Sequence, residues 1–166
     1  MKHQTCCFTG HRNIPEQEKE MLQNLLEKEI LELICQDVCT FLAGGALGFD
    51  TMAALTVLKF KEIFPGIRLI LALPCKDQEK NWSENDKKIY DQILHQADEA
   101  IYISEKYFTG CMQKRNRYLV DHSGVCVCYL TKSKGGAAYT VRYANQKGLR
   151  IIKLDWPVTA PAFSAP

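Results

Sequence analysis

FLAGGALGFDTMAAL, residues 41–55, decides the fold of this chain because it passes from a strand into a helix through a glycine-rich turn. Its first residues complete the apolar run VCTFLA (38–43), which predicts a buried strand. Gly44, Gly45 and Gly48 follow, and apolar residues then resume with the spacing of a helix. A strand that leads into a helix through bare backbone is typical of ligand-binding turns in α/β proteins.

The same alternation of strand and helix continues along the chain. The expected strands are 4–8, 38–43, 67–73, 100–104, 124–130 and 150–154, and the expected helices are 15–36, 51–64, 83–97, 112–123 and 137–147. Because the strand segments are continuously apolar, we expect them to be buried on both faces of a parallel sheet. The predicted class is α/β: a Rossmann-like, doubly wound, mainly parallel sheet with helices on both faces, in three α/β/α layers. Strand order 3-2-1-4-5 is the usual one for this class.

Length and composition limit the class of protein. The chain has 166 residues, 46% of them hydrophobic and 24% charged. No apolar segment approaches the ~20 residues that a membrane helix needs. We expect one cytoplasmic, Rossmann-like domain over residues 1–155 and a proline- and alanine-rich tail at 156–166. The eight cysteines lack paired metal-ligand spacings, so we expect buried reduced thiols and no metal site.

The distribution of charge favours a small anionic ligand. The chain carries 21 basic and 19 acidic residues, a net charge of +2, which argues against a strongly basic nucleic-acid-binding protein. Acidic residues gather in the expected helices at 16–32 and 83–99. The basic residues in or near connecting segments are Arg12, Lys114, Arg115, Arg117, Lys132, Lys134 and Arg142. A small anion fits this distribution better than a nucleic-acid duplex.

Three of the expected turns from strand to helix carry glycine. FTGHR (8–12) follows the first strand, AGGALGFD (43–50) the second and KSKGGAAYT (132–140) the fifth. In an open parallel sheet such turns meet at the carboxyl edge, where helix N-termini attract phosphate groups. Steric relief in a tight turn is the alternative explanation for any single glycine pair. Three such turns on one edge favour a phosphate-binding site.

Five motifs, in order over roughly residues 6–147, resemble one family. They are FTGHR, AGGALGFDTMAA, NW, MQKRNRYLVDHS and GGAAYTVRYA. Together they resemble the YpsA-like branch of the SLOG superfamily, which is related to the DprA and LOG (Lonely Guy) proteins. The resemblance implies a Rossmann-like sheet and a nucleotide-derived ligand such as ADP-ribose, an NAD-related compound or a nucleoside monophosphate. It also implies a role in bacterial cell division or stress.

The candidate ligand contacts lie in these motifs. Amides of both glycine turns are expected at phosphate groups, whereas Asp50 either accepts from a ribose hydroxyl or caps the following helix. Arg12 and Arg115 offer planar forks to phosphate, and His11 is either a phosphate donor or an ordinary loop histidine. Trp82 either stacks on a base or staples its loop to the next helix. The full set is Thr9, Gly10, His11, Arg12, Gly44, Gly45, Gly48, Asp50, Trp82, Arg115, Asn116, Gly135, Gly136 and Thr140.

Three functions compete. The first is a module that binds or senses a nucleotide, needs no cofactor, and acts through a protein partner or a homo-oligomer. The second is a LOG-like phosphoribohydrolase, whose glycine turn reads PGGxGTxxE. Here Arg142 and Tyr143 stand where that glutamate would be sought, which leaves Asp50 as the only carboxylate among the motifs for acid–base work. The third, DprA-like binding of single-stranded DNA, is disfavoured by the small net charge of +2. We therefore expect the binding module.

Overall fold

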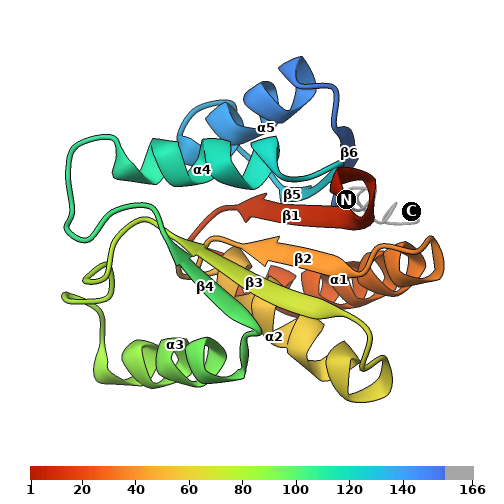
Figure 1. The fold of residues 1–166 in the computed structure, drawn as a ribbon, viewed down its shortest axis with the longest axis horizontal. Helices are drawn as coiled ribbons and strands as arrows, with labels where there is room; N and C mark the ends of the chain where they lie inside the picture. The colour runs from red at the N-terminus through yellow and green to blue at the C-terminus, as the bar shows by residue number, and fades with distance from the viewer. Residues whose placement is uncertain (156–166) are drawn as a thin grey trace, which may run out of the picture.

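The computed structural model describes residues 1–155 and shows an α/β fold with a six-stranded sheet (Figure 1). The strands are β1 (Thr5–Gly10), β2 (Thr40–Ala43), β3 (Arg68–Leu73), β4 (Glu99–Tyr102), β5 (Val125–Tyr129) and β6 (Arg150–Lys153). The helices are α1 (Glu16–Cys35), α2 (Phe49–Ile63), α3 (Glu84–Gln96), α4 (Cys111–Asp121) and α5 (Gly136–Gln146), preceded by a 3-10 turn, η1 (Lys2–Gln4). Each expected strand and helix is confirmed. The expected tail at 156–166 lies outside the described residues.

The strands lie in the order β4-β3-β2-β1-β5-β6, and every neighbouring pair is parallel. The expected order 3-2-1-4-5 is therefore wrong: β4 extends the sheet beyond β3, and β5 takes the place beside β1. Both orders use the same elements in the same sequence, and apolar patterning does not record which strands are neighbours. The order reverses between β1 and β5, which is the position where open α/β sheets bind ligands.

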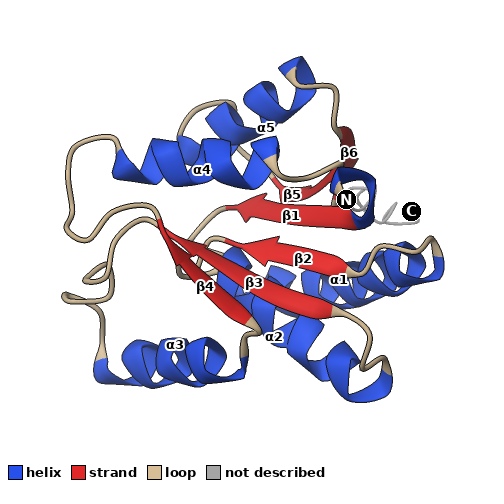
Figure 2. Ribbon diagram, in the orientation of Figure 1, coloured by secondary structure: helices blue, strands red, loops and turns tan. Residues whose placement is uncertain are grey.

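Helices cover both faces of the sheet. Figure 2 shows α1, α2 and α3 on one side and α4 and α5 on the other, and each side has its own hydrophobic core. Adjacent residues of β1 serve both cores, because Phe8 packs in the first and Cys7 in the second. The central strands β1, β3 and β5 are almost wholly buried, whereas the edge strands β4 and β6 are only half-buried.

The thiols are unbridged, as expected. Six of the eight lie in the interior, whereas Cys35 is exposed and Cys39 half-buried. Cys126 and Cys128 point to the same face of β5 and pack in the second core. None of the helices in residues 1–155 is long and apolar enough to cross a membrane.

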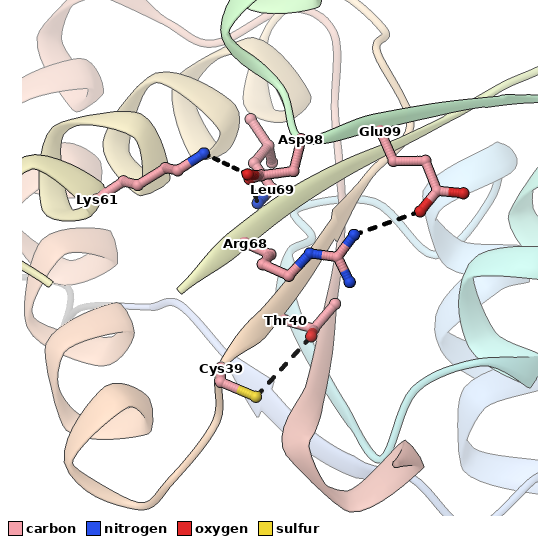
Figure 3. Close-up of polar contacts among 7 residues, drawn as sticks. All are labelled: Cys39, Thr40, Lys61, Arg68, Leu69, Asp98 and Glu99. Carbon is pink, nitrogen blue, oxygen red and sulfur yellow. Dashed lines mark hydrogen bonds and ion pairs between the residues drawn. The ribbon is translucent and has the colours of Figure 1, made fainter. Parts of the chain in front are cut away.

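Polar contacts fasten the edge strand β4 at the amino end of the sheet (Figure 3). Asp98, which directly precedes β4, accepts from the Leu69 amide at 2.9 Å and pairs with Lys61 Nζ at 2.5 Å. Arg68 and Glu99 pair across β3 and β4 at 3.5 Å. These contacts lie at the end of the sheet opposite the carboxyl edge. They therefore stabilise the pairing of β4 with β3 and do not contribute to the carboxyl edge.

Candidate functional site

A pocket of about 320 Å³ opens at the carboxyl edge, where the strand order reverses between β1 and β5. Its walls come from the end of β1 and from the N-terminal ends of α2, α4 and α5. The glycine-bearing turns follow β2, β1 and β5, which are neighbours in the sheet. The predicted contacts that line the pocket are Thr9, Gly10, His11, Arg12, Asp50, Arg115, Asn116 and Gly136. Sequence motifs more than a hundred residues apart thus meet at one site.

The other predicted contacts lie outside the pocket lining. Gly48 borders a groove between α1 and α2, and Thr140 is buried in α5, where its hydroxyl donates to Gly136 O at 2.8 Å. The Trp82 ring packs edge-on against Tyr90, with ring centroids 5.4 Å apart, in the first hydrophobic core. This contact staples the loop to α3, which is one of the two expected roles of Trp82, and stacking on a base stays a prediction. The remaining members of the set are Gly44, Gly45 and Gly135.

Asp50 and Arg115 are the buried charged groups of the pocket, with exposed fractions of 7% and 5%. Arg115 Nη1 donates to the Gly44 carbonyl, and its Nε donates to Asn116 Oδ1 at 2.7 Å. Asp50 Oδ2 accepts from the Ala46 amide at 3.2 Å, so this carboxylate ties down the turn instead of capping α2. The helix-capping alternative is not what the structure shows.

The two buried charges depend on each other. Burial raises the pKa of Asp50 above its ordinary value, and the positive charge of Arg115 opposes that rise. Burial likewise lowers the pKa of Arg115, and the negative charge of Asp50 opposes that fall. Removing either partner would leave the other charge uncompensated in the interior, which is costly.

Close packing explains the glycines of the turn at 44–48. A side chain on Gly44 would lie 2.7 Å from Arg115 Nη1 and 2.8 Å from Asp50 Oδ2. At Gly48, where φ is +77°, it would lie 2.1 Å from the carbonyl oxygen of Arg12. The glycines of this turn are in close contact with the rest of the protein, which supports the steric explanation for them. Phosphate binding by its amides stays a prediction.

The glycine turn before α5 is different, because it is open. A side chain on Gly135 would meet nothing within 4 Å, and one on Gly136 would meet only the Asn116 amide nitrogen, at 3.9 Å. Neither α4 nor α5 has a side-chain cap or an acidic residue in its first turn. In contrast, α1 and α3 begin with acidic residues, and Ser83 caps α3. Because the first amides of a helix have no partner within it, α4 and α5 present uncompensated positive ends.

Arg12 and His11 also line the pocket. Arg12 is exposed and lines the pocket, so its guanidinium is accessible to a ligand. His11 Nε2 accepts from the Thr131 amide at 2.8 Å, and burial, with the charge of Lys132, lowers the pKa of His11. A neutral His11 that accepts through Nε2 holds the segment after β5, which is the ordinary loop role.

Five lining residues were not among the predicted contacts: Phe8, Ala46, Met112, Leu119 and Ala137. Met112 could have been found, because it lies one helical turn before Arg115 and Asn116 on α4. Ala46 gives no chemical signal, since it contributes a backbone amide, and Phe8 and Leu119 read as ordinary core residues.

The fold is similar to that of two DNA processing proteins. DprA from Streptococcus pneumoniae superimposes with a TM-score of 0.68 over 95% of this chain, at 17% identity. DprA from Helicobacter pylori, whose structure was described for its single-stranded DNA binding mode, superimposes with a TM-score of 0.67 over 93% of the chain, at 21% identity. The chain spans 52% and 66% of these proteins, respectively. At this identity the likeness shows the fold alone.

The sequence is similar to proteins of one bacterial family. It is 36% identical over 138 residues to the uncharacterized SPbeta prophage-derived protein YoqJ of Bacillus subtilis, covering 75% of this chain and 81% of YoqJ. It is 35% identical over 129 residues to a UPF0398 protein of Halalkalibacterium halodurans, covering 76% of this chain and 68% of that protein. The YpsA family model, described as the YspA SLOG family, matches residues 6–154. The chain therefore belongs to the YpsA SLOG family.

Proposed function

We propose that this protein binds a nucleotide-derived ligand at the carboxyl edge, with phosphate at the N-termini of α4 and α5. The observation that carries the proposal is the open turn at Gly135 and Gly136, beside a pocket with an exposed Arg12. Uncapped helix ends without acidic residues favour a negative group there, and the arginine adds a planar donor fork.

The rest of the pocket suits the sugar and base of a nucleotide. Phe8, Met112 and Leu119 supply apolar wall, while Asn116 and Asp50 supply polar groups. A volume of about 320 Å³ lies at the lower end of the ~300–1,000 Å³ range of ligand pockets, which matches a group of mononucleotide size. Family membership and the related fold are consistent with this class of ligand, whose identity the experiment below addresses.

Gly136→Asp is the variant that tests phosphate binding. Its carboxylate would stand at the N-terminus of α5, where it favours the helix but repels a phosphate. We expect the affinity for AMP, ADP-ribose and NAD, measured by isothermal titration calorimetry, to fall by about tenfold or more. The melting temperature without ligand should stay the same or rise, which separates lost binding from lost folding. Gly66→Asp is the matched control, because Gly66 has open space around it and precedes β3, at the end of the sheet opposite the pocket.

Equal affinity of wild type and Gly136→Asp for these nucleotides would contradict the proposal, as would the absence of binding by wild type. Release of free base from the mixtures, detected by chromatography, would instead establish the phosphoribohydrolase. Asp50 favours keeping that second function in the test, because it is the one carboxylate lining the pocket in the described part of the chain. Loss of base release in Asp50→Asn, with AMP still bound, would then identify the acid–base group.

A further inference from the structure

A second cavity, of about 370 Å³, lies at the same edge of the sheet. It is formed by the loop 74–83 after β3, the loop 103–110 after β4 and the first turn of α4. Figure 1 shows both loops beyond the ends of the strands, on the side where α4 begins. Met112 lines this cavity and also the pocket between β1 and β5. The two cavities, of similar size, are therefore adjacent at Met112.

The lining of the second cavity suits a flat group with polar edges. Tyr107 is 63% exposed and lines the cavity, and the Met112 thioether and the Cys75 thiol supply soft apolar surface. Asn81 and Gln78 supply amides, and Asp77 and Lys80 supply one charge of each sign. An aromatic ring, a thioether and amides are groups that bind a nucleobase through its face and its edge.

The amide of Gln78 has a defined orientation. Its Nε2 donates to the Gly45 carbonyl at 3.2 Å and to Tyr90 Oη at 3.4 Å, and only the NH₂ group can pair with the carbonyl. Its Oε1 is buried and has no partner among the described residues. Buried polar groups are normally satisfied, so an amide oxygen left over beside a cavity marks a position where a ligand donor would be accommodated after a small side-chain adjustment.

The start of α4 lies between the two cavities. Its N-cap residue Gly110 has φ +96°, and a side chain there would meet nothing within 4 Å. The first turn carries neither a side-chain cap nor an acidic residue, and the Cys111 amide donates to the Phe108 carbonyl at 3.0 Å. Met112, in the same turn, lines both cavities, so the positive end of this helix lies next to each of them. A bridging phosphate group would be stabilised at this helix end.

We infer that the ligand has two halves joined by a diphosphate, as in a dinucleotide. One half occupies the pocket between β1 and β5, the diphosphate lies across the starts of α4 and α5, and a flat heteroaromatic half occupies the cavity beside Tyr107. A mononucleotide would fill only one of the two cavities of about 320 and 370 Å³. The inference rests on the proposed function and specifies the class of its ligand.

Asn81→Trp tests the second cavity. Asn81 is exposed and lines this cavity but not the first, so the indole would fill the space intended for the second half. We expect wild type to bind NAD about tenfold or more tightly than AMP. The variant should bind NAD only as weakly as AMP, with AMP affinity as in wild type. Asn85→Trp is the control, because Asn85 is an exposed residue of α3 that lines neither cavity.

Tyr107→Ala gives a second readout by removing the stacking face, and should weaken NAD binding by about tenfold with AMP unaffected. Equal affinity of wild type for AMP and NAD would overturn the two-part ligand and leave the proposed function standing. NAD binding that is unchanged in Asn81→Trp, or an equal loss for NAD and AMP, would also overturn it. If wild type binds neither nucleotide, the proposed function fails as well.

Discussion

At the scale of single residues, Arg115 holds the scaffold together and also lines the pocket. Its guanidinium lines the pocket, but its donors are directed to the Gly44 carbonyl and to Asn116, and its charge faces Asp50. One side chain thus connects α4 with the turn after β2, which lies 71 positions earlier in the sequence. Arg115 shapes the pocket, while Arg12 is the arginine accessible to an anion.

Arg115→Met should lower the free energy of unfolding by about 3 kcal/mol, because it leaves Asp50 buried without its cation and Gly44 O without its donor. Arg117→Met, on the same helix, removes an exposed guanidinium that lies over the Tyr139 ring, and should cost much less than Arg115→Met. Urea unfolding curves of the two variants make the comparison. Losses of equal size would contradict the account of Arg115. Adding Asp50→Asn to Arg115→Met should recover part of the loss.

At the scale of elements, two turns that look alike in the sequence serve opposite purposes. Both place adjacent glycines between a strand and a helix. In the turn before α2, Gly48 is held against the Arg12 carbonyl, whereas Gly136 before α5 has free space around it. Glycine is a steric requirement in the first turn and leaves backbone amides accessible in the second.

Gly48→Ala should destabilise the protein by about 2 kcal/mol or more, because the new Cβ collides with the Arg12 carbonyl at a residue with φ +77°. Gly136→Ala should leave stability unchanged or raise it by about 0.5 kcal/mol, since alanine is the better helix former and has room there. Thermal melts of both variants check the contrast. A destabilised Gly136→Ala or a tolerated Gly48→Ala would contradict the assignment of the two turns.

The edge strand β4 gives a prediction of pH dependence. Burial acts to raise the pKa of Asp98, but hydrogen bonds from Lys61 and the Leu69 amide outweigh it and hold that pKa below its ordinary value of 3.8. Since the folded pKa lies below the unfolded one, the stabilisation is present above the ordinary pKa and is lost as pH falls through the folded value. Asp98→Asn should therefore cost about 1 kcal/mol at pH 7 and progressively less in acid.

Urea unfolding at several pH values measures the Asp98→Asn effect. Glu99→Gln is the control, because the Glu99 carboxylate is half exposed in its 3.5 Å pair with Arg68 and should contribute little. An Asp98→Asn effect that stays constant from pH 7 into acid would argue against the charge-assisted contacts shown in Figure 3.

At the scale of the whole molecule, the pattern of apolar residues was sufficient to predict the helices and strands but not the order of the strands in the sheet. Leu22, Leu26, Ile30 and Leu33 follow helical spacing and are fully buried on one stripe of α1, so that helix could be predicted from the sequence. The position of β4 could not, because EAIY carries no mark of whether it pairs with β1 or with β3. Whether β4 lies beside β3 or beside β1 depends on the path of the connection through α3.

For the site, likewise, the positions of some residues could be predicted from the sequence, but their roles could not. Gly136 and Asn116 could be placed at the carboxyl edge from their positions at the starts of helices. The roles of Asp50 and Trp82 could not be fixed, since they depend on which neighbour the folded chain provides: the Ala46 amide for one and the Tyr90 ring for the other. A role that depends on a backbone amide or on a tertiary partner cannot be inferred from the type of the residue alone.

The cysteines differ in burial, so the rate at which each one is alkylated reports on the part of the fold that contains it. We expect an alkylating reagent to reach the exposed Cys35 at once in the native protein, whereas the buried Cys111, at the start of α4, should react only when the carboxyl-edge loops open. Cys75 lines the second cavity, and burial and the neighbouring Asp77 raise its pKa, which slows its reaction. Labelling kinetics resolved by peptide mass would therefore report loop opening next to the second cavity separately from unfolding of the sheet, with no probe added to the chain.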